Sequence, residues 1–252
     1  MRMARGAEMR QVGAGASSGL QHLRLIAALA AAGIAGPVVF TVLVIVQGLL
    51  QPDYSHVALP ISALAAWPSG WIQNVNFVVL GLLMTAYAVG LQLGVRPRRG
   101  GVIGPVLLVL SGTGLVLAGL FPWRGANPPI VPVGHMIAAF LGFLGAGSGL
   151  IVVSRRMARD PKWRNVAAYA LATGIAIVVL FVVNGFLVRP DDAPLHAWAG
   201  VVQRVTVLVW FSCTIVLALR LLRVARAQGA AGLSQPGESS ERRATTLSNP
   251  GS

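Results

Sequence analysis

The sequence predicts an all-α fold, an integral membrane bundle of six transmembrane helices whose spans pair as three helical hairpins. Two observations support this prediction. Only 11% of the 252 residues are charged, whereas a soluble domain usually carries about 25%. The apolar residues also form six runs of roughly 20 residues, the length that crosses the hydrocarbon core of a bilayer. Because the runs are continuous and do not alternate with polar residues, they indicate helices and exclude the strands of a membrane barrel.

The six spans are expected at residues 25–49, 74–93, 102–120, 134–153, 166–187 and 199–222. The first run is longer than the apolar core of a signal peptide, which has about 7–15 residues, so a retained first helix is expected. Each odd-numbered run ends in a glycine and two large apolar residues with a proline soon after, as in Gly119-Leu120-Phe121-Pro122. Glycine and proline commonly stop helices, and their recurrence also favours three related hairpins.

The basic residues gather on one side of the expected membrane. The formal net charge is +13, and seventeen of the 20 Lys and Arg residues fall in the N-terminal segment, the second and fourth loops and the C-terminal segment. The positive-inside rule therefore predicts a multi-pass protein of the plasma (inner) membrane with both termini in the cytoplasm. Topology and attraction to anionic lipid headgroups account for this charge, so the bilayer is the expected partner and nucleic acid is not.

The two ends of the chain differ from its middle. Residues 1–22 are basic and rich in Gly and Ala, and residues 227–252 are rich in Gly, Ser, Thr and Pro. Neither segment has an apolar periodicity that would offset the entropy of ordering, so both are expected to be disordered. Residues 23–226 form the six-helix domain. The single cysteine, Cys213, lies in the sixth run, which excludes a disulfide within the chain.

Polar residues gather at the extracytoplasmic end of the spans, whereas the cytoplasmic halves are nearly all Ala, Leu, Val, Ile and Gly. Arg204 lies about six residues inside the sixth span, or ~9 Å along its axis. An arginine at that depth either pairs with another group, commonly at a functional site, or extends its head to the surface. The candidate ligand-binding residues are Arg204, Gln203, His196, His135, Asn74, Asn76, Asp53 and Asn184.

A metal site is an alternative use of the same layer. His56, His135 and His196 come from three different hairpins, and three histidines with an open position are typical of catalytic zinc. The spacing is not diagnostic, because no two histidines lie one helical turn apart. A polar cap at the membrane interface explains each histidine as well. No cofactor is therefore predicted, and zinc stays as the alternative.

Three stretches are similar to a known family. They are Trp71-Ile72-Gln73-Asn74-Val75-Asn76-Phe77, then Leu117-Ala118-Gly119-Leu120-Phe121-Pro122 followed by His135, and Gly200-Val201-Val202-Gln203-Arg204 followed by Trp210. With them the chain resembles the prokaryotic six-helix membrane proteins of domain-of-unknown-function family nine-nine-eight. The resemblance implies six spans and an outer polar layer, and it suggests that Asn74, Asn76, His135, Gln203 and Arg204 belong together. It implies no activity.

The function stays open at this stage, because no established catalytic motif is present and enzyme status is therefore undecided. The first hypothesis is a polar site at the extracytoplasmic end that binds a lipid headgroup or a partner membrane protein, with arginines meeting phosphate. The second is a metal-dependent membrane lipid hydrolase built on the three histidines. The third is a small transporter, which requires a cavity reaching past the middle of the membrane, near Thr85, Thr173 and Cys213.

Overall fold

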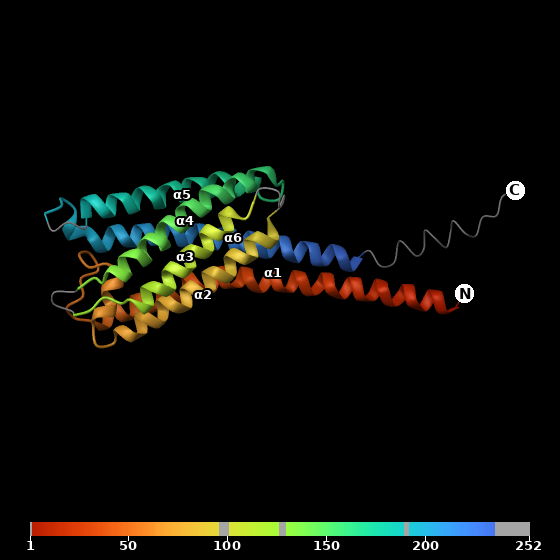
Figure 1. Cartoon of the computed structure of the whole chain (residues 1–252), viewed down its shortest axis with the longest axis horizontal. Coiled ribbons are helices and arrows are strands. Elements are labelled where there is room, and N and C mark those ends of the chain that lie inside the picture. The colour runs from red at the N-terminus through yellow and green to blue at the C-terminus, as the bar shows by residue number, and fades with distance from the viewer. Residues whose placement is uncertain (1, 96–100, 126–129, 189–191, 235–252) are drawn as a thin grey trace.

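The computed structural model describes the backbone of residues 2–95, 101–125, 130–188 and 192–234. Within these ranges the chain forms six long helices and no β-strand. The long helices are α1 (Arg2–Leu50), α2 (Gly70–Gly94), α3 (Ile103–Leu120), α4 (Val133–Arg159), α5 (Arg164–Val183) and α6 (Ala199–Ser234), and three short turns are η1 (Ile61–Ala66), η3 (Asn184–Val188) and η4 (His196–Trp198) (Figure 1). The six-helix bundle predicted from the sequence is confirmed.

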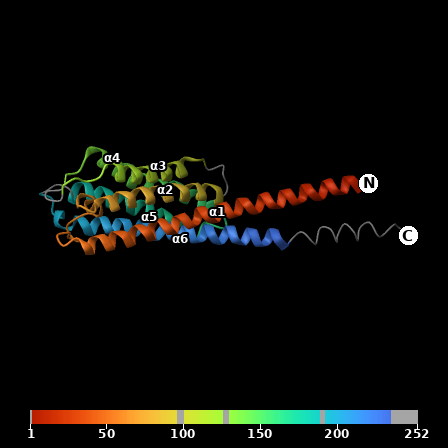
Figure 2. The same cartoon turned by 90° about the horizontal axis from the view of Figure 1, so that it is seen from below.

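The helices follow one another around the bundle. Each packs on the next in the chain, and α6 returns to lie beside α1, while α5 packs closely on α4 and more loosely on α6. The start of α1 and the end of α6 lie at the same end of the bundle, which we call the terminal end, and both helices project beyond the others there (Figures 1 and 2). The opposite end, formed by the loops after α1, α3 and α5, is called the distal end.

The ends of the chain differ from the sequence prediction. The backbone of α1 is helical from Arg2, inside the segment 1–22 that was expected to be disordered, and α6 continues to Ser234, inside the expected tail 227–252. A helix that already exists can extend without a new nucleus, and Ala, Arg, Met and Gln favour extension. Disorder was expected because these segments have no apolar face that could pack against a core. Residues 235–252 lie outside the described residues.

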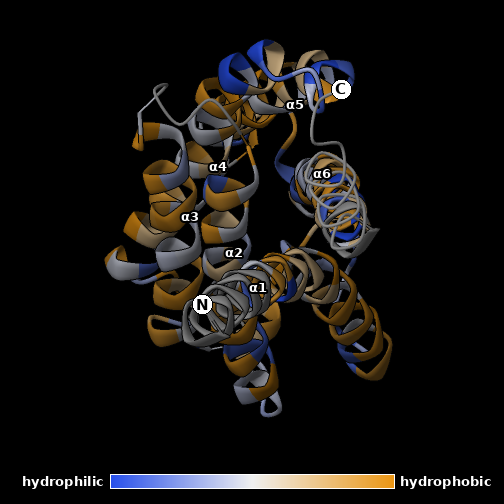
Figure 3. Ribbon diagram, turned by 90° about the vertical axis from the view of Figure 1, so that its right-hand side faces the viewer, coloured by the Kyte–Doolittle hydropathy of each residue, from blue (hydrophilic) through white to orange (hydrophobic). Residues whose placement is uncertain are grey.

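All six long helices carry apolar stretches suited to a membrane. Each is long and apolar enough to cross a bilayer, yet only 28–44% of each apolar window is buried inside the protein. More than half of every window therefore faces outward, and apolar residues cover the outer faces of the helices in Figure 3. Lipid contact explains this exposure, which a water-soluble bundle would not tolerate.

Small residues let neighbouring helices approach closely, as is common in membranes. A Cβ atom added to Gly81 of α2 would lie 2.5 Å from the carbonyl oxygen of Gly112 in α3. A Cβ atom on Gly114 of α3 would lie 2.4 Å from the backbone nitrogen of Gly142 in α4, and Gly147 and Gly174 make the same close approach between α4 and α5. These contacts fix α2 to α5 as one continuous packed layer.

A buried arginine joins α4 to the end of α2 near the terminal end. Arg156 is only 3% exposed, and its guanidinium donates hydrogen bonds to Gln92 Oε1 at 2.5 Å and to the Val95 carbonyl at 2.6 Å. Trp163, fully buried after α4, donates its indole N–H to the Gly94 carbonyl at 3.3 Å. These bonds satisfy carbonyls that the end of α2 leaves without helical partners.

We expect Arg156→Leu to lower the free energy of unfolding by about 2–3 kcal/mol, because charged hydrogen bonds to buried groups are lost. Arg155→Leu is the matched control, since Arg155 is the exposed neighbour on the same helix, and its effect should stay within about 0.5 kcal/mol. Thermal unfolding in detergent measures the stability of both variants, with alkylation of the buried Cys213 as the signal of unfolding. Equal midpoints for the two variants would contradict the assigned role of Arg156.

Candidate functional site

Arg204 organises the loop between α1 and α2, residues 51–69, which we call loop one. Its Nη1 donates hydrogen bonds to the carbonyls of His56, Leu59 and Gly200 at 2.7, 3.1 and 3.0 Å. Its Nη2 donates to Tyr54 Oη at 2.6 Å and contacts His56 Nδ1 at 3.2 Å. Both terminal nitrogens of the guanidinium are therefore directed to loop one, so Arg204 is a structural anchor for this loop.

Tyr54 is the aromatic partner of this arginine. The guanidinium carbon lies 5.6 Å from the ring centroid, within the range of a cation–π contact. Burial raises the pKa of the Tyr54 hydroxyl above its ordinary value of 10.0, while the nearby Arg204 charge and hydrogen bond act in the opposite direction. The hydroxyl therefore stays protonated and also donates toward the carbonyls of Leu59 and Pro60.

Gln203 holds the next part of loop one. Its Oε1 accepts a hydrogen bond of 2.5 Å from the backbone N–H of Ile61, at the start of η1. Because the amide oxygen accepts from this backbone donor, the NH2 group of the same amide keeps its two donors for other partners. Gln203 also lines the cavity described below, so the same side chain contacts both loop one and that cavity.

His135 lies in the first turn of α4 and is buried, with 5% exposure. Its Nδ1 lies 3.0 Å from the Phe121 carbonyl. Since a carbonyl can only accept, Nδ1 carries a proton and donates it. The rings of Phe77 and Trp123 meet the imidazole edge-on, at centroid distances of 6.3 and 6.2 Å. These contacts hold the ring in one orientation.

Asn184 is positioned by a change in helix type. The end of α5 passes into a π-helical turn, Asn184–Val188, and such turns often occur at functional sites because they redirect side chains. Here the turn places Asn184, Gly185 and Phe186 along one wall of a cavity. The expected span 166–187 thus covers both α5 and a local irregularity that an apolar run does not reveal.

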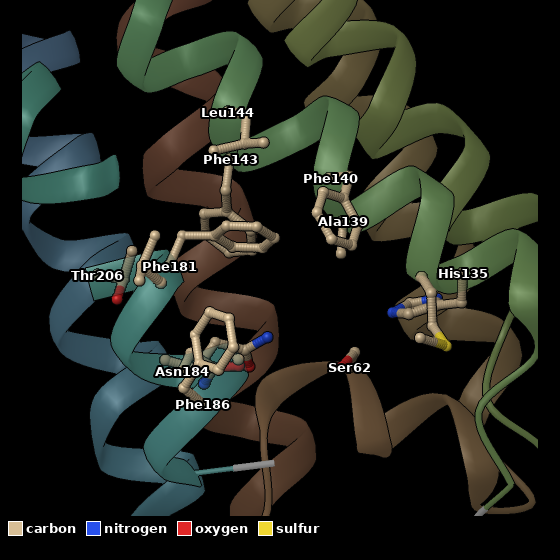
Figure 4. Close-up of a pocket in the computed structure, with 14 residues that line it drawn as sticks. Ser62, His135, Ala139, Phe140, Phe143, Leu144, Phe181, Asn184, Phe186 and Thr206 are labelled. Carbon is tan, nitrogen blue, oxygen red and sulfur yellow. The ribbon is translucent and has the colours of Figure 1, made fainter. Parts of the chain in front are cut away.

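A cavity of roughly 570 Å³ opens between α4, α5, α6 and η1, within the usual range for small-molecule sites. Figure 4 shows Phe140 and Phe143 of α4 and Phe181 of α5 around its upper part, with Ser62 and His135 across the space from Asn184 and Phe186. Its polar lining residues are Ser62, His135, Asn184, Gln203 and Thr206, and its apolar lining residues are Met136, Ala139, Phe140, Phe143, Leu144, Phe181, Val182 and Phe186.

A smaller space of roughly 50 Å³ continues the cavity toward the centre of the bundle. It shares Ser62, His135, Ala139, Phe143 and Gln203 with the main cavity. Its inner wall is aromatic and is made by Phe40, Phe77, Trp210 and Phe211, which pack at ring-centroid distances of 5.3 to 5.8 Å. Thr85, Thr173 and Cys213 are not among the described residues that line either space.

The candidate residues divide into separate groups. His135, Gln203 and Asn184 meet at the cavity, and Arg204 turns from it to loop one. Asp53 and His196 are exposed in loops, and His196 Nδ1 contacts the Val188 carbonyl at 3.1 Å. The family resemblance suggested that Asn74, Asn76, His135, Gln203 and Arg204 belong together, but the two asparagines are on α2 and line neither space.

Asn76 belongs to a buried amide cluster between α1 and α2. Gln73 Oε1 accepts hydrogen bonds from Gln47 at 3.0 Å and from Asn76 at 3.4 Å, and Asn76 also donates to the Phe40 carbonyl at 3.2 Å. Gln73 is fully buried. Each of these three amides has one buried polar atom that meets no hydrogen-bond partner among the described residues, as does the Asn74 side chain.

The three histidines proposed for zinc lie in three different settings. His56 Nδ1 faces the Arg204 guanidinium, His135 Nδ1 faces the Phe121 carbonyl and His196 is exposed near Val188. In the part of the chain that the structure describes, no three His, Cys, Asp or Glu side chains gather as metal ligands. The geometry offers no support for joining His56, His135 and His196 in one zinc site.

Several cavity residues could not be selected from the sequence. Ser62 is 3% exposed and Thr206 is buried in α6, where its hydroxyl donates to the Val202 carbonyl at 2.8 Å. Threonine in an apolar helix usually bonds to its own helix, and a lone serine in a loop is not diagnostic, so neither was among the candidate site residues. In the sequence, the phenylalanines that line the cavity cannot be told apart from phenylalanines that face lipid. What brings them together is the packing of α4, α5, α6 and η1 around one cavity, which a sequence pattern does not contain.

The fold and the apolar helices define this chain as a multi-pass membrane protein of the all-helical class. A family model described as "Protein of unknown function (DUF998)" matches residues 34–220. The chain belongs to this family, which confirms the family resemblance seen in its motifs. No curated protein and no solved structure matches the chain.

Proposed function

We propose that this protein binds a membrane lipid in the cavity between α4, α5 and α6. The observation that carries the proposal is the division of the cavity into an aromatic part and a polar end. Phe140, Phe143 and Phe181 form an apolar wall, and Ser62, His135 and Gln203 supply hydrogen-bonding groups beside it. A lipid has the same two parts, an apolar chain and a polar head, so the lining matches its chemistry along the whole length.

The position of the mouth supports entry from the membrane. Phe140, Met136 and Phe186 line the cavity and are 53%, 42% and 77% exposed. Since these residues lie on apolar helix faces that a bilayer would cover, the opening is directed sideways toward lipid. With the termini in the cytoplasm, as the charge bias predicts, the distal end faces outward and the lipid comes from the outer leaflet.

This proposal revises the chemistry assigned to Arg204. The sequence hypothesis placed phosphate on the arginines, but the Arg204 guanidinium is held by carbonyls of loop one. Its role in lipid binding is therefore indirect, because it fixes the part of loop one that leads into η1, where Ser62 lies. A partner membrane protein, the other option considered from the sequence, would have to cover an exposed face, whereas the cavity is an internal space of ligand size.

The test uses Ala139→Phe, which places a ring in the cavity at a residue that lines both of its parts. Wild-type protein purified in mild detergent is expected to retain about one lipid per chain in native mass spectrometry. Filling the cavity should weaken lipid binding roughly five- to 150-fold and so lower this occupancy, since overpacking costs about 1–3 kcal/mol and 1.4 kcal/mol is tenfold in binding.

The control is Ala172→Phe, an exposed alanine of α5 that is not among the described lining residues. It adds the same ring to a lipid-facing surface and should leave both lipid retention and thermal stability unchanged. Equal lipid retention in wild type and Ala139→Phe, or the absence of retained lipid in folded wild-type protein, would count against lipid binding in this cavity.

A further inference from the structure

We propose that the cavity selects a lipid whose head is uncharged and bears a hydroxyl group, such as a diacylglycerol, over a phospholipid with the same chains. This inference rests on the proposed lipid binding and adds the chemistry of the headgroup to it. Its starting point is the adjacency of Ser62 and the Gln203 amide at the polar end of the cavity.

The described lining residues include no Asp, Glu, Lys or Arg. A phosphate in a low-dielectric space needs a charge-assisted donor or a metal, since burying an unpaired charge is costly. Arg204 follows the cavity residue Gln203 in the chain. Both terminal nitrogens of its guanidinium already contact groups of loop one or Gly200. The described cavity therefore supplies no arginine or lysine for an anionic head, and the Nδ1 of its one histidine, His135, is already used on the Phe121 carbonyl.

The polar atoms that the cavity does supply suit a hydroxyl. Gln203 lines the cavity and its Oε1 is held by the Ile61 N–H, so the hydrogen-bonding capacity that this side chain can offer a ligand is the donor capacity of its NH2 group. Ser62 follows Ile61 directly, is 3% exposed, and its hydroxyl can both donate and accept. An alcohol oxygen can accept from the Gln203 amide while its own proton goes to Ser62, which leaves no charge to neutralise.

The size of the polar end agrees with a small head. The polar groups are on η1, the first turn of α4, the start of η3 and the first part of α6. Phe143 continues the lining with its ring centroid 5.6 Å from that of Phe181 and 6.0 Å from that of Trp210. A lipid with a compact head can therefore place that head among the polar lining residues while its acyl chain lies along the aromatic rings.

The experiment compares two lipids that differ only in their heads. Diacylglycerol and phosphatidylglycerol probes, each with the same photoreactive acyl chain, are placed at equal mole fraction in phosphatidylcholine nanodiscs containing the full chain. Because the reactive group is on the chain, the crosslink yield at α4 and α5 reports cavity occupancy for both. We expect the diacylglycerol yield to be higher roughly tenfold or more, reflecting the cost of a buried unpaired charge.

The hydroxyl contact is tested with Ser62→Ala. Loss of one hydrogen bond, worth about 0.5–1.5 kcal/mol, should lower the diacylglycerol yield roughly two- to tenfold and leave phosphatidylglycerol unchanged. Ser148→Ala is the control, because the Ser148 hydroxyl bonds to the Leu144 carbonyl of its own helix and does not line the cavity. Thermal unfolding of both variants, followed at Cys213, checks that the fold is kept.

The outcomes separate the headgroup inference from the lipid-binding proposal. If phosphatidylglycerol crosslinks as well as diacylglycerol and Ala139→Phe removes both signals, the cavity binds lipid but the inferred head is wrong. If Ser62→Ala changes neither yield, the inferred hydroxyl contact is wrong. If neither probe reaches the cavity in folded wild-type protein, both proposals fail together.

Discussion

Arg204→Met is expected to release loop one and to lower the free energy of unfolding by about 3–5 kcal/mol. The variant keeps an apolar stem of similar length but removes donors to the carbonyls of His56 and Leu59 and to Tyr54. Hydrogen bonds from a charged group contribute about 1.5–3 kcal/mol each and are not fully additive. Thermal unfolding in detergent measures the loss, and hydrogen exchange of residues 51–69 should show faster opening there.

Two further variants define the role of this arginine. Arg204→Lys keeps the charge but has one nitrogen in place of the planar fork, so it should restore only part of the stability. Arg220→Met, on the same helix, removes a single exposed hydrogen bond to the Lys162 carbonyl and should cost less than about 1 kcal/mol. A lysine variant as stable as wild type would mean that charge, not geometry, carries the effect.

The second large effect is expected at the contact between α3 and α4. A Cβ atom on Gly145 would lie 2.8 Å from the Leu107 carbonyl oxygen and 2.9 Å from the Ser111 nitrogen. Both are backbone atoms, so the helices must separate to accept any side chain. Gly145→Ala should destabilise the protein by about 1–3 kcal/mol, and Gly145→Leu should prevent recovery of folded protein.

Gly142, one turn earlier on α4, provides the matched control. A Cβ atom there would meet nothing within 4 Å, so Gly142→Ala should be neutral or stabilising by up to about 1 kcal/mol through helix propensity. The midpoint of Cys213 alkylation on heating in detergent compares the two alanine variants. If Gly142→Ala and Gly145→Ala unfold at the same temperature, close backbone packing is not what fixes these helices.

The fold could be predicted because its main determinant is local. A run of apolar residues such as 102–120 is sufficient to specify a membrane helix, and the structure begins α3 at Ile103 and ends it at Leu120. The helix ends toward the terminal end were harder, since Arg156 and Arg159 continue α4 beyond the apolar run. Long basic side chains are compatible with a helix that leaves the membrane, so hydropathy alone underestimates its length.

The candidate site could be predicted only in part. Arg204 and Gln203 were selected because they are polar residues inside the sixth apolar run. Which groups they bond to depends on how loop one packs on α6. Arg204 bonds to residues about 150 positions earlier in the chain, and no local pattern encodes that distance. Ser62 was not among the candidate residues, and Asn184 was selected for its polarity alone, because the π-helical turn that directs it into the cavity is not visible as a pattern.

The depth of the cavity has a consequence for how its occupancy would respond to the membrane. On α4 its lining extends from His135 to Leu144, which is about 14 Å of helix in a hydrocarbon core of ~30 Å. A lipid bound there exchanges with one monolayer only. By mass action, the fraction of protein occupied follows the mole fraction of that lipid in this monolayer. Moving the lipid to the opposite monolayer would empty the cavity even though the total amount in the bilayer had not changed.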